Sequence, residues 1–311
     1  MKTSILERTP MRRILAAGLL ATLAVTACSA PATTPSASGE AEGSDRSFDV
    51  SGVAKVDDIA ALLPQAIADK GTLTIGAAID YAPAEFRADD LTTAIGYDVD
   101  LGKAIGKVLG VETEVVDGEF ASLLPGIGTK YDIGISSFTI TDERTANFTM
   151  ISYITVGSSF AVKAGNPDGF DPEELCGQTI GVQTGTWQEE ELATFTEACE
   201  AEGQEPIEVL PYAKQSDVTT NLVGGKVAAF YADSTVASYA VALTGDQLEV
   251  VGGVRDAAPQ GIVVAQDDTE LAAAVQRAVQ HLMDDGTWPA ILDSWGVTDA
   301  ALDTAEIHPQ A

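Results

Sequence analysis

The segment Tyr131–Tyr153, YDIGISSFTITDERTANFTMISY, combines a strand, a polar loop and the start of a helix. Its first six residues, Tyr131–Ser136, are small and apolar and alternate in hydropathy, which predicts a short buried strand. Residues 137–140 then place two hydroxyl groups and an aromatic ring in a loop. Thr141 suits the N-cap position of a helix whose first turn holds two acidic residues.

Arg144 lies in that same first turn. A cation at the positive end of the helix dipole is mildly unfavourable, so something should offset it. An anion held by Arg144, the loop hydroxyls and free main-chain N–H groups would do so. Alternatively, Arg144 pairs with Asp142 or Glu143, or is simply solvated. The residues alone leave these interpretations open.

The chain on both sides of this segment alternates between strand and helix patterns, which predicts the α/β class. Before it we expect a helix at 56–70 divided at Pro64, strands at 72–77 and 111–116, and helices at 96–109 and 120–127. After it we expect strands at 153–163, 179–183, 208–211, 227–231, 248–252 and 258–264, and helices at 186–201, 215–223, 235–243 and 268–284.

The composition limits the classes of function. The 311 residues are 45% apolar, which is normal for a globular protein, and the formal net charge is −30. Such an acidic surface repels nucleic acid, so we expect no nucleic-acid partner. The sequence holds no nucleotide-binding GxxxxGK[ST], no GxSxG and no HExxH motif. We therefore expect no cofactor and no metal.

The N-terminus has the features of a targeting segment. Residues 1–27 place a basic pair before an apolar run, Ile14–Val25, that is too short to span a membrane comfortably. The sequence VTAC at 25–28 resembles a lipobox, which predicts a lipidated Cys28; an ordinary secretory signal is the alternative. Residues 28–55 are rich in Ser, Ala, Pro, Thr and Gly and are expected to form a disordered tether. The expected location is the outer face of the cell membrane, through a lipid anchor.

The other cysteines, Cys176 and Cys199, then remain as a pair. Outside the cell they should form a disulfide that closes a loop and stabilises the fold by roughly 3 kcal/mol in the chain-entropy model. A metal site needs more ligands, and no histidine lies near either thiol in the sequence.

The central segment also matches a known pattern. The motif SSxTxTxxR, followed by Phe and Tyr, resembles the ligand loop of bacterial solute-binding proteins of family 3, the polar amino acid receptors of ABC transporters. The matching residues are Ser136, Ser137, Thr139, Thr141, Arg144, Phe148 and Tyr153. Further matches are GYDVDLGKAIG at 96–106, FASLLPGI at 120–127 and the segment around DGTW at 285–288, so the resemblance covers about residues 60–302.

The resemblance implies a fold: an α/β, two-lobe, periplasmic-binding-protein-like clamshell of type II with a hinge between the lobes. Lobe 1 would comprise residues 56–155 and 258–311, and lobe 2 would comprise residues 156–257. Gly157 is expected near the hinge.

The resemblance also implies how the backbone of an amino acid is held. Arg144 and Thr139 would bind its α-carboxylate, helped by Thr186 and Trp187 at the start of a helix in lobe 2. The alternative for Thr186 is a plain capping box with Glu189 at the surface. A backbone contact tolerates Trp187, whereas the family has a threonine there.

Asp233 would bind the ligand ammonium, together with Ser137 and Thr139. The family pattern around Asp233 is matched by Gly225, Lys226 and Ser234, whereas its first aspartate is Ala228 here. The alternative is that Asp233 only caps the helix that follows it.

The ligand side chain would lie among aromatic residues of lobe 1, namely Tyr81, Phe120 and Phe138. Packing in the core is the alternative for these rings. Three acidic residues in lobe 1 loops, Asp80, Glu85 and Glu119, are expected to face the cleft, which favours a polar or basic amino acid. The alternative is that these carboxylates, in so acidic a chain, are simply solvated.

We therefore expect a monomeric substrate-binding lipoprotein of an ABC importer, with a membrane permease and its ATPase as partners, and not an enzyme. Two alternatives stay open. One is a secreted enzyme of the cyclohexadienyl dehydratase type on the same fold, using Glu85 or Glu119 as general acid or base. The other is a ligand-sensing subunit.

Overall fold

The computed structural model describes residues 47–245 and 247–308. The strands are β1 (Thr72–Ala77), β2 (Asp80–Tyr81), β3 (Glu85–Arg87), β4 (Ala94–Ile95), β5 (Glu112–Asp117), β6 (Ile133–Gly134), β7 (Phe148–Lys163), β8 (Thr179–Gln183), β9 (Glu208–Tyr212), β10 (Ala229–Asp233) and β11 (Leu248–Ala265). The α-helices are α1 (Asp57–Ala60), α2 (Gln65–Lys70), α3 (Tyr97–Leu109), α4 (Phe120–Leu123), α5 (Asp142–Thr145), α6 (Trp187–Ala201), α7 (Gln215–Val223), α8 (Ser234–Thr244), α9 (Thr269–Asp284) and α10 (Thr287–Ser294). Short 3₁₀ helices are η1 (Val50–Gly52), η2 (Leu124–Gly126) and η3 (Thr298–Ala300).

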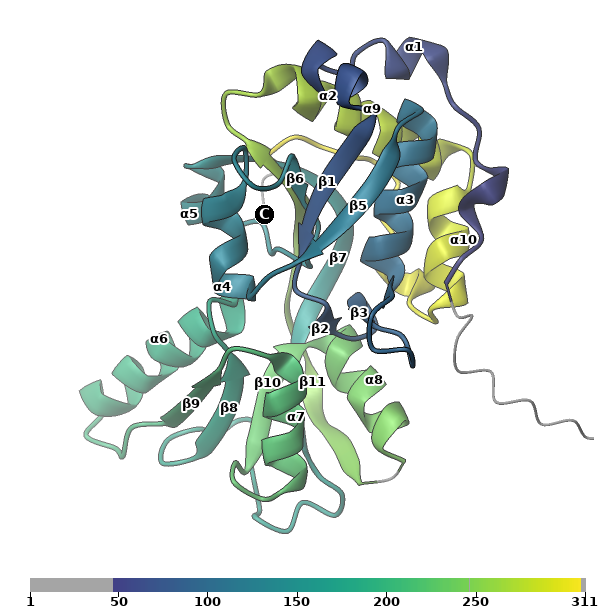
Figure 1. Cartoon of the computed structure of the whole chain (residues 1–311). Coiled ribbons are helices and arrows are strands. Elements are labelled where there is room, and N and C mark those ends of the chain that lie inside the picture. Colours follow the sequence, from purple (N-terminus) through teal and green to yellow (C-terminus); the bar gives the residue numbers. More distant parts are fainter. Residues whose placement is uncertain (1–46, 246, 309–311) are drawn as a thin grey trace, which may run out of the picture. The chain divides into compact units, whose positions relative to one another are not determined.

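The main sheet has the strand order β5-β1-β6-β11-β7-β10-β8-β9 (Figure 1). The strands β5, β1 and β6 are parallel to one another at one side, and β10, β8 and β9 are parallel at the other. The long strands β7 and β11 pair with each other in antiparallel fashion between these two groups. Because strands alternate with helices over most of the chain, the prediction of an α/β fold is confirmed.

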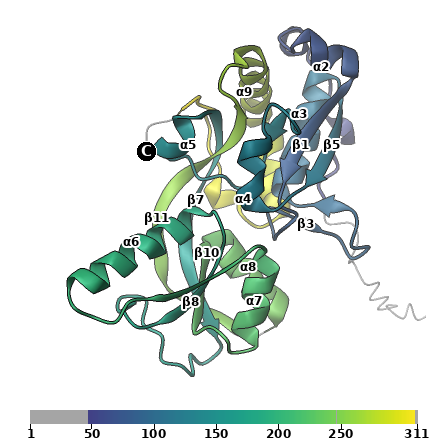
Figure 2. The same cartoon turned by 60° about the vertical axis from the view of Figure 1, so that its left-hand side comes forward.

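Each group of strands carries its own helices, and the two groups define two lobes (Figure 2). The first lobe is built on β1, β5 and β6 with α3, α9 and α10; the second is built on β8, β9 and β10 with α6, α7 and α8. The predicted lobe boundaries, 155/156 and 257/258, fall within β7 and β11. They stay a prediction, because both strands belong to both lobes.

The sequence predicted two separate strands where the structure has the single strand β11. Residues 253–257 read as a loop because they include a glycine and charged side chains. In the structure they continue the ladder with β7, with register shifts between Val251 and Arg255 and between Arg255 and Ala258. Opposite this irregular stretch lies Gly157, where an added Cβ would collide with Val254 and with the carbonyl of Arg255. The close approach of the two backbones therefore requires glycine at 157.

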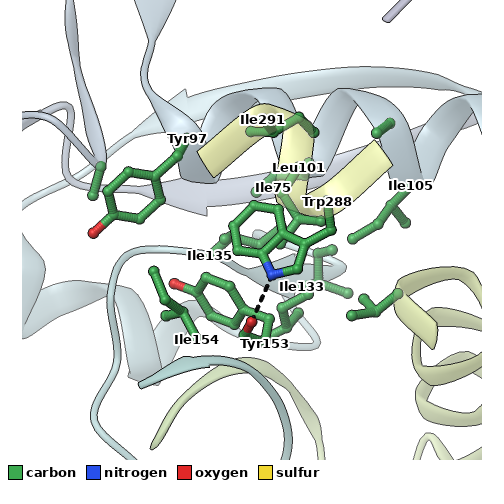
Figure 3. Packing of buried hydrophobic residues seen from close by; sticks show 14 of the residues in the cluster. Ile75, Tyr97, Leu101, Ile105, Ile133, Ile135, Tyr153, Ile154, Trp288 and Ile291 are labelled. Carbon is green, nitrogen blue, oxygen red and sulfur yellow. Dashed lines mark hydrogen bonds between the residues drawn. The ribbon is translucent and has the colours of Figure 1, made fainter. Parts of the chain in front are cut away.

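The core of the first lobe includes the C-terminal part of the chain (Figure 3). Trp288 of α10 is fully buried, and its indole N–H donates a hydrogen bond of 2.8 Å to the carbonyl oxygen of Tyr153. The rings of these two residues meet edge to face. A buried indole with a satisfied N–H stabilises both the packing and the position of β7. The C-terminal segment thus completes the first lobe.

The predicted tether ends earlier than expected. We expected disorder up to residue 55, but from residue 47 onward the chain packs against the first lobe. Phe48, Val50 and Val53 are partly buried against its core, and the main-chain N–H of Phe48 donates a 2.9 Å hydrogen bond to Asp100 of α3. The composition of the whole segment predicted disorder, but burial of these few apolar side chains stabilises its last residues against the lobe.

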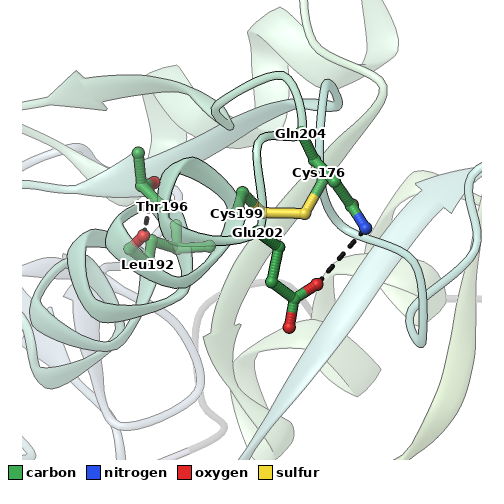
Figure 4. Close-up of a disulfide and its surroundings, with 6 residues drawn as sticks. All are labelled: Cys176, Leu192, Thr196, Cys199, Glu202 and Gln204. Atoms are coloured by element: carbon green, nitrogen blue, oxygen red, sulfur yellow. Dashed lines mark hydrogen bonds between the residues drawn. A yellow bond between two sulfur atoms is a disulfide. The ribbon is translucent and has the colours of Figure 1, made fainter.

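The predicted disulfide is present between Cys176 and Cys199 (Figure 4). It joins the loop before β8 to the last turn of α6, and Cys199 packs into the core of the second lobe. Within the described residues, no helix is both long and apolar enough to cross a membrane.

Candidate functional site

Arg144 is buried between the lobes rather than solvated. Thr141 caps α5 and accepts a hydrogen bond from the N–H of Arg144, as predicted. The guanidinium donates from Nη1 to the carbonyl oxygen of Thr139 at 2.8 Å, and from Nη2 to the carbonyl oxygen of Gly185 at 3.1 Å. Among the described residues, Arg144 forms no ion pair with Asp142 or Glu143. Burial lowers the pKa of Arg144, and the charges of Glu190 and Asp233 act against this shift.

Asp233 ends β10 in the second lobe and is 3% exposed. It stands at the N-cap position of α8, but its side chain makes no capping hydrogen bond, so capping does not explain it. Its two carboxylate oxygens accept hydrogen bonds from Gln188 at 2.8 Å and from Gln260 at 2.6 Å. Burial raises the pKa of Asp233 to about 6, although both hydrogen bonds and the charge of Arg144 lower it.

Arg144 and Asp233 line the same buried cavity, which is small, with a volume of about 10 Å³. The cavity is lined by Tyr81, Phe120, Ser137, Thr139, Arg144, Thr186, Trp187, Gln188 and Asp233. It therefore brings together all the residues predicted for the carboxylate and the ammonium of an amino acid, from both lobes. A cationic group and an anionic group of opposite lobes face one small space, which is the arrangement that a zwitterion needs.

The aromatic residues divide between the cavity wall and the layer behind it. Tyr81 and Phe120 line the cavity, whereas Phe138 does not. Phe138 is fully buried and stacks on Phe120, with 4.9 Å between ring centroids. The guanidinium carbon of Arg144 lies 5.9 Å from the centroid of Phe120 and 6.0 Å from that of Phe138. Phe138 thus supports the wall and the arginine through core packing and a cation–π contact.

The three acidic residues expected to face the cleft do not line the cavity. Glu119 is exposed at the start of α4. Glu85 is buried inside the first lobe, where it accepts a 2.6 Å hydrogen bond from the hydroxyl of Ser136. Asp80 bridges the lobes, accepting from the main-chain N–H of Gln215 at 3.1 Å and from Gln183 Nε2 at 3.4 Å. The sequence showed that these loops lie near the cleft but not which way each side chain turns.

Thr186 begins α6 and both caps the helix and lines the cavity. Its hydroxyl accepts from the N–H of Glu189 at 3.3 Å. Glu189 does not close the predicted capping box: it accepts from the N–H of Gly185 at 2.6 Å instead of that of Thr186. The main-chain N–H groups of Thr186 and Trp187 belong to the first turn, where a helix supplies no acceptor of its own.

Gly185 is the point at which the second lobe approaches the first. Its φ of +82° lies in the left-handed region, and a Cβ there would lie 3.0 Å from the Cβ of Ala121 in α4. Glycine is therefore required both by the turn and by the contact.

Sequence reasoning missed two residues of the site, Gln188 and Gln260. Both are almost fully buried, and both donate to Asp233. Gln260 could have been noticed as a polar residue at the start of the apolar run GIVVA. Gln188 gave no such signal, because its position in the first turn of a helix is typical of exposed residues.

A wider groove adjoins the cavity between α5 and α6 and shares Thr139 and Trp187 with it. Its lining includes four acidic residues, Asp142, Glu143, Glu190 and Asp256. Among the described residues, no group of three or more His, Cys, Asp or Glu side chains is arranged to hold a metal ion.

The chain belongs to the bacterial extracellular solute-binding proteins, family 3, whose model matches residues 73–298. The resemblance read from the motifs is therefore confirmed. Membership of this family also supports the fold of two lobes.

Two kinds of relative show what the chain is similar to. It is 36% identical to the arginine-binding protein ArgT of Corynebacterium glutamicum over 258 residues. This aligned region covers 82% of this chain and 84% of ArgT. Among solved structures, a mutant of ArgBP from T. maritima has a TM-score of 0.68 and 30% identity, covering 74% of this chain and 97% of that one. The ancestral amino acid-binding protein AncCDT-1, a precursor of cyclohexadienyl dehydratase, has a TM-score of 0.67 and 28% identity, covering 74% and 98%. ArgT and AncCDT-1 are both named as amino-acid-binding proteins.

Proposed function

We propose that this protein binds a cationic amino acid, with L-arginine as the first candidate, between its lobes and delivers it to the permease of an ABC importer driven by its ATPase. The observation that carries the proposal is the placement of Arg144 and Asp233 on one cavity. Arg144 holds the ligand carboxylate with Thr139 and the first N–H groups of α6. Asp233 holds the ammonium, with Ser137 and Thr139 beside it.

The energies agree with such a role. A hydrogen bond to a charged group contributes about 1.5–3 kcal/mol. A few of these, with an apolar contact from Tyr81 and Phe120, reach the roughly −8 kcal/mol of micromolar binding. An ammonium beside Asp233 also stabilises its ionised form, whose burial is otherwise costly.

Two features support a cationic side chain. The first is the acidic groove that adjoins the cavity, together with the net charge of −30, because both attract a cation and accelerate its encounter with the site. The second is the aromatic wall made by Tyr81 and Phe120, against which a guanidinium stacks favourably. The relative ArgT is named for arginine binding, which makes arginine the first ligand to test.

Binding is coupled to closure because the ligand contacts come from both lobes. Arg144 already bonds to Gly185 across the lobes, as Asp80 does to Gln215, and the hydroxyl of Tyr81 accepts from the N–H of Asp233 at 3.1 Å. A ligand that adds further bonds across the lobes stabilises the closed form relative to the open one. The permease would recognise the closed form.

The test is a thermal-shift screen of the common amino acids, followed by calorimetric titration of those that raise the melting temperature. We expect the largest shift with arginine, then with lysine or ornithine, and recovery of unaltered ligand after incubation. A protein that responds to none of the cationic amino acids would contradict the proposal.

The proposed attachment to the membrane rests on Cys28, which lies outside the described residues. Two or more acyl chains on this residue would anchor the protein firmly. We expect the wild-type protein to incorporate labelled palmitate and to sediment with membranes, and Cys28→Ser to do neither. Sedimentation and labelling that persist in Cys28→Ser would contradict the anchor but not the binding function.

A further inference from the structure

Two buried carboxyl groups lie directly beneath the loop that lines the ligand cavity. They belong to Glu85 of β3 and Asp98 of α3, which are 0% and 1% exposed. Glu85 accepts the 2.6 Å hydrogen bond from the Ser136 hydroxyl, and Asp98 accepts a 2.8 Å hydrogen bond from the main-chain N–H of Ser137. Each carboxyl group therefore holds one of two successive residues of the loop.

Ser137 has a backbone conformation that needs such support. Its φ is +49°, in the left-handed region that a serine adopts only at a cost in free energy. The hydrogen bond to Asp98 fixes the N–H of this residue and so holds the turn. From this turn the chain runs to Thr139, whose carbonyl oxygen accepts from Arg144 and whose backbone pairs with Gln260. The orientation of the cavity-lining loop thus depends on Asp98.

The two carboxyl groups also depend on each other. Glu85 Oε2 and Asp98 Oδ1 are buried and accept no main-chain or amide N–H in the described part of the chain; the two carboxyl groups interact with each other, and the hydroxyl of Tyr153 interacts with Asp98 and lowers its pKa. The remaining titratable groups around them are Asp80 and Tyr81 of β2, Tyr97 of α3 and Tyr153 of β7, none of them a cation. Burial first, and the charge of Asp98 second, raise the pKa of Glu85 well above its usual range; burial also raises that of Asp98. Two adjacent buried carboxylates without a cation cannot both be ionised at neutral pH, so one proton stays between them.

We propose that Glu85 and Asp98 are positioning residues of the ligand site: as a carboxyl pair that shares one proton, they hold Ser137 in its left-handed turn and thereby place Thr139 and Arg144 for binding. This proposal rests on the proposed function for its affinity readout. Loss of the shared proton at alkaline pH would place two negative charges in contact, release the turn and weaken binding.

The first test compares the pH dependence of arginine binding in the wild type and in Glu85→Gln. Glutamine reproduces a permanently protonated Glu85, since its oxygen can accept from Ser136 and its NH₂ can donate to Asp98. We expect affinities within about threefold of each other at pH 7, and a steeper loss of affinity above neutral pH in the wild type than in the variant. Titration of the ligand and of Asp233 affects both proteins equally and cancels in the comparison. If the affinities of the wild type and of Glu85→Gln depend on pH in the same way, the two carboxyl groups do not share a proton and the proposal is wrong.

The second test addresses the turn itself through a double-mutant cycle. We expect Asp98→Ala to weaken arginine binding by about tenfold or more when residue 137 is serine, and by less than about threefold in a Ser137→Gly background, because glycine adopts the turn unaided. An equal loss in both backgrounds would overturn the role of Asp98 in holding Ser137. Should Asp98→Ala fail to fold, Asp98→Asn replaces it. We expect this variant to bind arginine at pH 7 as the wild type does, but without the loss of affinity above neutral pH. An unchanged loss of affinity at alkaline pH would contradict the proposed carboxyl pair.

A third measurement needs no ligand and separates this proposal from the proposed function. At neutral pH the infrared spectrum of the wild type should show the carbonyl band of a buried protonated carboxyl group that disappears in the double variant Glu85→Gln/Asp98→Asn. If that band is present but no amino acid binds, the proposed function fails while the carboxyl pair stands. If the band is equally strong in both proteins, the pair is not its source and the proposal is wrong.

Discussion

The guanidinium of Arg144, from the first lobe, donates a 3.1 Å hydrogen bond to the main-chain carbonyl of Gly185 in the second. The residue proposed to hold the ligand carboxylate therefore also joins the lobes directly. Its other hydrogen bond, to the carbonyl of Thr139, keeps it on the cavity wall. If Arg144 holds the ligand as proposed, ligand binding and lobe closure act through the same side chain.

Replacement of Arg144 tests its contribution to binding. We expect Arg144→Ala to weaken arginine binding by about 100-fold or more, since two charged hydrogen bonds of about 1.5–3 kcal/mol each are lost. Isothermal titration calorimetry measures the change, and circular dichroism checks the fold. Arg277→Ala is the matched control, because that arginine is exposed on α9 and should leave the affinity unchanged. A similar loss in both variants would point to general electrostatics instead of a specific grip.

Asp233 predicts a pH dependence of binding at mildly acidic pH. Its pKa is raised to about 6, so the carboxylate that is proposed to attract the ligand ammonium becomes protonated below that pH. We expect the affinity for arginine to fall as the pH is lowered through about 6, and Asp233→Asn to bind at least about tenfold more weakly at pH 7 with a flatter profile. Titrations between pH 5 and 8 measure this, and an equally steep profile in Asp233→Asn would assign the titration to another group.

The same residue predicts the opposite trend for the stability of the unliganded protein. Its folded-state pKa of about 6 lies above the ordinary value of 3.8, so the folded state binds the proton more tightly than the unfolded state does. The free energy of unfolding should therefore fall as the pH rises from about 4 to about 6. Asp233→Asn should reduce this fall. Urea unfolding at a series of pH values, without ligand, tests the sign.

Asp80 does not line the cavity, but we expect its replacement to affect closure of the two lobes. It comes from the first lobe, yet its carboxylate accepts from the first N–H of α7, whose own N-cap residue, Lys214, makes no side-chain capping bond. Loss of a helix cap costs about 0.5–2 kcal/mol, so we expect Asp80→Ala to weaken arginine binding by roughly 2- to 30-fold, mainly through faster dissociation. Stopped-flow kinetics measures the rates. Asp217→Ala, an exposed acid in the first turn of α7, is the control and should not change the dissociation rate.

The disulfide predicts a change in stability alone. Cys176 and Cys199 lie in the second lobe and do not line the cavity. We expect the double variant Cys176→Ser/Cys199→Ser to lose about 2–4 kcal/mol of unfolding free energy in the second lobe while binding arginine with unchanged affinity. Urea unfolding and calorimetry measure the two quantities. A large loss of affinity in a folded variant would mean that the bond shapes the ligand site.

Much of the fold could be predicted because local signals agree with the final structure. Thr141 and Thr186 cap α5 and α6 where the sequence placed these helix starts, and Pro64 separates α1 from α2. The continuity of β11 could not be predicted, because residues 253–257 extend only by pairing with β7. The order at Phe48 escaped prediction for a similar reason, since its partner, Asp100, is distant in sequence.

The candidate site, like the fold, could be predicted only in part. The motif around Arg144 and the position of Asp233 identified two residues that the structure brings to one cavity. The orientations of Asp80, Glu85 and Glu119 could not be predicted, because the sequence indicated only loops there, and a loop residue can turn to solvent, to the core or across the cleft. In the structure Asp80 lies in β2 and Glu85 lies in β3. Only the partners Gln215 and Ser136, supplied by other segments, decide the first two.

The most direct test of the account compares two ligands against two proteins by calorimetry. Arginine and agmatine differ in the α-carboxylate, and the wild type and Arg144→Ala differ in its proposed partner. We expect Arg144→Ala to weaken arginine binding by about 100-fold or more while changing the already weak binding of agmatine by less than about threefold. An equal loss for both ligands would show that Arg144 does not hold the carboxylate, and would contradict the account.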